Sequence, residues 1–188
     1  MPERTPIKMS LADLKAELAQ VARIGQAFVD GDLCRQVYQP GAETFMTGDD
    51  MDFNPEACVP LKKTLLRLER VSKAPCSTTL WRRRPDDPAA GEALIYGSLG
   101  SPLGGGKPGN RGYKPPRMVP QLAAAFMKGR AAWRSGRHPN AAEMADRGQA
   151  VPVRGVKGLV MVEHFVPVRD SMGEIAAVLE VFAAAQGT

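Results

Sequence analysis

A chain of 188 residues is long enough for one domain with a substantial core, and 44% hydrophobic and 24% charged residues is an ordinary globular composition. The sequence has no run of 18 or more apolar residues, which argues against a membrane span, and its polar N-terminus lacks the apolar core of a signal peptide. We therefore expect a single domain over residues 1–188 in the cytoplasm, although an excised extracytoplasmic domain would have the same features.

The net charge of +5 is concentrated in the middle of the chain. Eleven lysines and arginines lie between Lys107 and Lys157, and only Glu143 and Asp146 oppose them. Such a surplus favours anionic partners. Few aromatic residues interleave with the basic ones, so we expect no nucleic-acid partner, and the simpler interpretation is a solvated basic loop.

Three cysteines, Cys34, Cys58 and Cys76, are widely spaced. Their odd number argues against a disulfide framework, and the absence of a CxxC pair argues against a zinc site. We expect reduced, mostly buried thiols, with no metal and no cofactor.

The first predicted element is a helix from Ser10 to about Val29. Ser10 is a favourable N-cap, and Asp13 completes the spacing of a capping box. Apolar residues then recur at helical spacing along one face. A second helix is predicted to begin after Pro60, because Leu61, Leu65 and Leu68 repeat at the same period.

The pattern then changes to that of strands. Residues 76–84 and 93–98 are predicted as a pair of strands around a turn at 85–88. The Gly- and Pro-rich residues 99–116 indicate a long loop, followed by a short helix at about 118–128. Residues 129–156 are predicted to be irregular and basic, with one helical turn at 141–145.

The end of the chain carries the clearest pattern. Residues 159–168 and 175–184 are predicted as two antiparallel strands around a tight turn at 170–173. Helices separated from an antiparallel sheet form an α+β layer fold.

Motifs for common chemistries are incomplete. The run Gly104-Gly105-Gly106-Lys107 lacks the first glycine and the final Ser or Thr of a phosphate-binding loop. The acidic turn that begins at Asp50 has proline where a calcium loop needs glycine. We find neither a nucleophile elbow nor a nucleophile with a neighbouring base, so we expect no enzyme.

Two strands carry candidate ligand contacts. Alternation places His164 on one face among four valines, where its ring needs either a backbone partner or a ligand. Alternation also places Trp81 and Arg83 on one face, where Arg83 is either a solvated strand end or a carboxylate-binding group.

Four segments together resemble the Cache (PDC) superfamily of PAS-like sensor domains. The closing segment 164–179 (HFVPVRDSMGEIAAVL) is similar to the family's final hairpin. The residues 27–33 (AFVDGDL), 78–86 (TTLWRRRPD) and 113–116 (YKPP) resemble the end of its long N-terminal helix, its first hairpin and the segment over its sheet. Unlike typical members, this chain carries neither flanking membrane helices nor an output domain.

The resemblance implies a PAS-like antiparallel sheet with a long N-terminal helix packed on one face, and a small-molecule sensing function. Together with the basic surplus, it predicts a small anionic ligand, such as a carboxylate, held between the sheet and segment 99–130. It also implies a homodimer formed through the helix from Ser10. The alternative is an interaction domain that has kept the fold without a ligand. The predicted ligand contacts are Trp81, Arg83, Tyr96, Tyr113 and His164.

Overall fold

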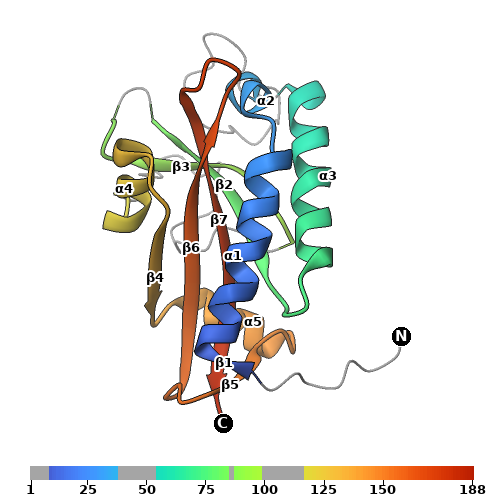
Figure 1. Cartoon of the computed structure of the whole chain (residues 1–188), viewed down its shortest axis with the longest axis vertical. Helices are drawn as coiled ribbons and strands as arrows, with labels where there is room; N and C mark the ends of the chain where they lie inside the picture. The colour runs from blue at the N-terminus through green and yellow to red at the C-terminus, as the bar shows by residue number, and fades with distance from the viewer. Residues whose placement is uncertain (1–8, 38–53, 85–86, 99–116) are drawn as a thin grey trace, which may run out of the picture.

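A computed structural model describes residues 9–37, 54–84, 87–98 and 117–188. In this part of the chain, one seven-stranded, mainly antiparallel sheet is covered by helices (Figure 1). The mixed α+β class predicted from the sequence is therefore confirmed. The helices are α1 (Leu11–Phe28), α2 (Gly31–Gln36), α3 (Pro55–Val71), α4 (Pro120–Lys128) and α5 (Pro139–Asp146). The strands are β1 (Met9–Ser10), β2 (Ser77–Arg83), β3 (Gly91–Tyr96), β4 (Ala132–Gly136), β5 (Val151–Arg154), β6 (Leu159–Arg169) and β7 (Ile175–Gly187).

The long strand β7 lies at the centre of the sheet. It pairs along one edge with β6, which in turn pairs with β4. Along its other edge it pairs first with β2 and then, near its C-terminal end, with β5. The β2–β3 and β6–β7 hairpins thus lie in one antiparallel sheet, as predicted, and only the pairs of β5 with β1 and with β7 are parallel.

Helices cover both faces of the sheet. Figure 1 shows α1 running along β6 and β7, with α3 beside it, and these helices and α2 bury the larger apolar cluster. On the opposite face, α4 packs Leu122 and Phe126 over Trp81 and Phe165, and α5 packs Met144 over Phe182. The strands contribute to the clusters on both faces because successive side chains alternate between the faces.

Side chains close in the sequence cap the N-terminal ends of α1 and α2. Ser10 and Asp13 form a capping box, with the Asp13 amide donating to Ser10 Oγ at 3.1 Å. Asp30 begins α2 by accepting from the amides of Asp32 and Leu33. Both helices therefore satisfy N-terminal amides that would otherwise lack partners.

The helix that was predicted to begin after Pro60 is α3, and it begins earlier, at Pro55. Asn54 is the N-cap of α3, so Pro60 lies inside the helix rather than before it. A proline at that position removes one helical hydrogen bond. Ala57 and Leu61 are both buried, however, so the apolar stripe continues past Pro60 and packing outweighs the lost bond.

The segment 129–156 was predicted as irregular apart from one helical turn at 141–145; the turn is confirmed within α5, but the prediction for the remainder was wrong. It contains β4, α5 and β5. The strands are short and carry Arg134, Gly136 and Pro152, residues that give no alternating apolar pattern. Pairing with β6 and β7 creates them.

Candidate functional site: an arginine-lined pocket

The structure separates the residues predicted as one site. Trp81 is buried beneath α4, and Tyr96 lies opposite Thr79 in the β2–β3 pair. His164 lies on the other face of the sheet, and Tyr113 is outside the described residues. Arg83 lines a pocket.

His164 stacks face to face on Trp133 of the edge strand β4. The ring centroids are 3.9 Å apart with an interplanar angle of 2°, and Lys15 Nζ lies 5.6 Å from the Trp133 ring on α1's side of the sheet. His164 Nδ1 has no hydrogen-bond partner among the described residues. His164 is thus an aromatic packing residue between β4 and β6.

Burial lowers the pKa of His164 to about 4, and burial together with the nearby Arg134 charge lowers that of His138 to about 4. These are the two histidines of the chain. We therefore expect both imidazole rings to remain neutral from pH 8 down to pH 5 in the folded protein, and NMR titration of their ring protons would check this. A titration centred near pH 6.5 for His164 would contradict the buried, stacked position.

A pocket of about 310 Å³ lies where β2 leaves the central strand. The β2–β7 pairing ends at Trp81 and Val178, so the first residues of β7 extend past it. The space beside them is bounded by α2 on one side and α4 on the other. We call it the arginine pocket. Its lining residues are Cys34, Arg35, Arg82, Arg83, Phe126, Ile175 and Ala176.

Three arginines line this pocket, and two of them are paired with carboxylates. Arg82 Nε is paired with the buried Glu92 carboxylate at 2.7 Å, and Arg35 Nε with Asp170 at 2.5 Å. The guanidinium of Arg83 reaches the sulfur of Met127 at 3.4 Å and has no carboxylate partner among the described residues. A cation that no described carboxylate neutralises, beside an apolar wall, suits a small anion.

Cys34 is the thiol of this pocket. Burial, with a smaller contribution from the Asp30 charge, raises its pKa to about 12. The thiol therefore stays protonated at neutral pH, and the pocket holds no thiolate nucleophile.

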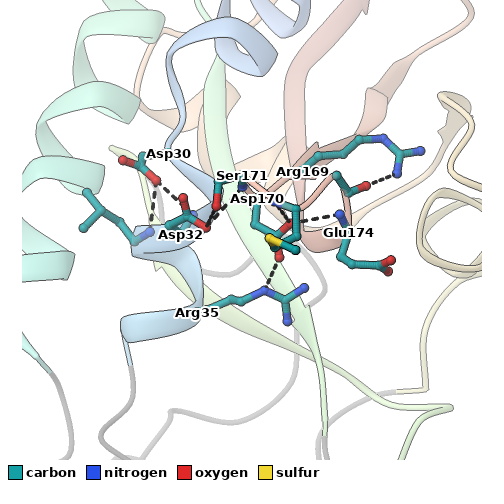
Figure 2. Close-up of polar contacts among 10 residues, drawn as sticks. Asp30, Asp32, Arg35, Arg169, Asp170, Ser171 and Glu174 are labelled. Atoms are coloured by element: carbon teal, nitrogen blue, oxygen red, sulfur yellow. Dashed lines mark hydrogen bonds and ion pairs between the residues drawn. The ribbon is translucent and has the colours of Figure 1, made fainter.

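A set of polar contacts joins α2 to the turn between β6 and β7 (Figure 2). Asp170 accepts from Arg35 through one oxygen and, through the other, from the amides of Met172 and Glu174 at 3.0 and 2.9 Å. From the helix side, Asp32 accepts from both the amide and the hydroxyl of Ser171. We call these contacts the α2–turn lock.

Asp170 is ionised within this lock. Desolvation works against the charge, but hydrogen bonds from Arg35 and from the amides of Glu174 and Met172 outweigh it and keep the pKa of the carboxyl below its ordinary value. The lock therefore contains a charge-assisted pair at neutral pH, with Arg35 belonging both to it and to the arginine pocket.

Sequence reasoning missed a buried pair of carboxyl groups. Glu163 on β6 and Glu180 on β7 lie on the α4–α5 face, between the two apolar clusters of that face. Trp81 Nε1 donates to Glu180 at 2.8 Å, and Arg134 pairs with Glu163 at 3.1 Å. Burial raises the pKa of both carboxyls, and repulsion from Glu163 adds to the rise at Glu180.

The sequence does carry a signal for this buried pair, namely a single glutamate within each of two apolar strands. Glu163 and Glu180 interrupt the apolar strands β6 and β7, but alternation alone cannot show that both fall on the same face as diagonal neighbours, with Glu163 paired to Phe182 and Glu180 to Phe165. Glu180 Oε1 and Thr79 Oγ1 have no hydrogen-bond partner among the described residues.

No family model, curated protein or solved structure matches this chain. Among the described residues, no cluster of three or more histidine, cysteine or acidic side chains could hold a metal ion. None of the described helices is long and apolar enough to cross a membrane.

Proposed function

We propose that this chain is a PAS-like small-molecule sensing module that binds a small anion in the arginine pocket, and not an enzyme. The observation that carries the proposal is the pocket itself, where Arg83 lies beside Phe126 and has no carboxylate partner in the described part of the chain. Phe126 belongs to α4, part of the segment expected to cover the site. The central position of the β6–β7 hairpin and the packing of α1 across it support the PAS-like architecture.

We expect one of four small anions, phosphate, sulfate, acetate or malonate, to raise the melting temperature of the protein at constant ionic strength. A ligand at one hundred times its Kd stabilises the native state by about 2.7 kcal/mol. For a domain of this size that corresponds to a rise of roughly 5–10 °C. Arg83→Gln should abolish the rise because it removes the cation that would face the anion, whereas Arg154→Gln, which changes an exposed arginine on β5, should preserve it.

Two results would contradict the proposal. An unchanged melting temperature with all four anions, or a full rise in Arg83→Gln, would show that the arginine pocket is not an anion site. His164 lies on the other face of the sheet, so His164→Ala is expected to retain the rise.

The second candidate is an interaction domain without a ligand. A groove of about 280 Å³ runs between α1 and α3, and its exposed apolar side chains include Phe28 and Val71, 72% and 58% exposed. The groove favours a protein contact and supports the proposal of a homodimer formed through α1. An interaction domain of this kind would give no anion-dependent rise in melting temperature.

A further inference from the structure

The arginine pocket and the α2–turn lock share one side chain. Arg35 lines the pocket, and its Nε atom is paired with Asp170 of the turn. Figure 2 shows the two terminal nitrogens of Arg35 pointing away from Asp170. An arginine fork can donate from Nε to one acceptor while its terminal nitrogens donate to another.

The acceptor in the turn is held in place by its own contacts. The carboxylate of Asp170 is fixed through the amides of Met172 and Glu174, so it cannot turn away from Arg35 without breaking both bonds. The close approach of Gly31 to the backbone of Arg169 brings the start of α2 against the end of β6. The guanidinium is therefore oriented by the turn and not by the pocket alone.

We infer that Arg35 bridges the bound anion and the β6–β7 turn, with Nε on Asp170 and its terminal nitrogens on an oxyanion that has at least two oxygens. This inference rests on the proposed anion-binding function. The ligand class is a carboxylate or a phosphate, because both present two oxygens to one guanidinium. Asp170 is then a positioning residue, and occupancy of the pocket reaches the turn and α2 through Arg35.

The turn amides give a direct readout of this bridge. Malonate and inorganic phosphate serve as separate probes, which distinguishes a carboxylate from a phosphate site. With either probe bound, solvent exchange of the Met172 and Glu174 amides, measured by NMR, should slow about fivefold, equivalent to about 1 kcal/mol. The reason is that a bound anion immobilises Arg35 and, through it, the acceptor of both amides.

Two variants separate the bridge from simple stabilisation of the fold. Arg35→Lys keeps the positive charge but replaces the planar guanidinium fork, with its separate Nε and terminal N–H groups, by one compact ammonium that does not span the turn and the anion in this geometry. At a saturating probe concentration the two amides should therefore exchange at the rate of the free protein. Arg35 is half exposed, so the change should leave the fold intact. Asp32→Asn is the matched control, because it alters the same lock without touching Arg35 and should retain the slowing.

The outcomes distinguish the two proposals. If neither malonate nor phosphate raises the melting temperature, the bridge is overturned, and anion binding fails with it when sulfate and acetate also leave the melting temperature unchanged. If a probe raises the melting temperature while the Met172 and Glu174 amides exchange as before, the pocket binds anions and the bridge alone is overturned. Equal slowing in Arg35→Lys would overturn it as well.

Discussion

Glu180→Gln should make the protein increasingly more stable than the wild type as the pH rises from 5 to 8. The pKa of Glu180 is raised well above its ordinary value, first by burial and then by Glu163, so the folded state holds a proton that the unfolded state releases. The contribution of Glu180 to the free energy of unfolding of the wild type therefore falls with rising pH above about 4.5, the ordinary pKa. One such proton contributes up to about 1.4 kcal/mol per pH unit.

A glutamine at this position keeps the hydrogen bond from Trp81 but has no proton to release. Its carbonyl can accept from Trp81 Nε1, and its amide can donate toward Glu163. The measurement is urea unfolding of the wild type and the variant across this pH range, compared as a difference. The difference removes the opposing effect of the two histidines, whose lowered pKa values destabilise the fold as the pH falls below 6.5.

Glu143→Gln is the control for this comparison. Its carboxylate forms an exposed ion pair with Arg147 on α5, and such pairs contribute little to stability. Parallel pH curves for the wild type and Glu180→Gln would contradict a protonated carboxyl at position 180.

Gly31→Ala should destabilise the fold and separate α2 from the turn. A Cβ atom on Gly31 would lie 2.2 Å from the carbonyl oxygen of Arg169 and 2.7 Å from the amide nitrogen of Asp170. Both are backbone atoms, so the helix or the hairpin must move, at a cost of about 1–3 kcal/mol. For this chain length we expect the melting temperature to fall by roughly 3–10 °C.

The same displacement should weaken anion binding, because Arg35 and Asp170 would lie on elements forced apart. Gly136→Ala is the matched control, since its Cβ would meet no atom within 4 Å and should change stability by no more than about 0.5 kcal/mol. If Gly31→Ala melted at the temperature of the wild type and responded to anions in the same way, α2 and the turn would not be held at this distance.

Several elements could be predicted from the sequence because their signals are local. The capping box at Ser10 and the helical stripe after it lie within a few turns of chain. The β6–β7 hairpin is indicated by two apolar strands around a tight turn, where Gly173 has a φ of 83°, a conformation that favours glycine. Such signals need no knowledge of distant residues.

Only the tertiary structure shows which residues come together in the candidate sites. Strand alternation correctly placed Trp81 and Arg83 on one face of β2, but it could not show that β2 leaves β7 just after Trp81 and opens the arginine pocket there. Arg35 and Asp170 are 135 residues apart, and Glu163 and Glu180 meet only because β6 and β7 pair in one register. Sequence periodicity fixes the face on which a side chain lies, whereas its neighbours depend on which strands pair and where that pairing ends.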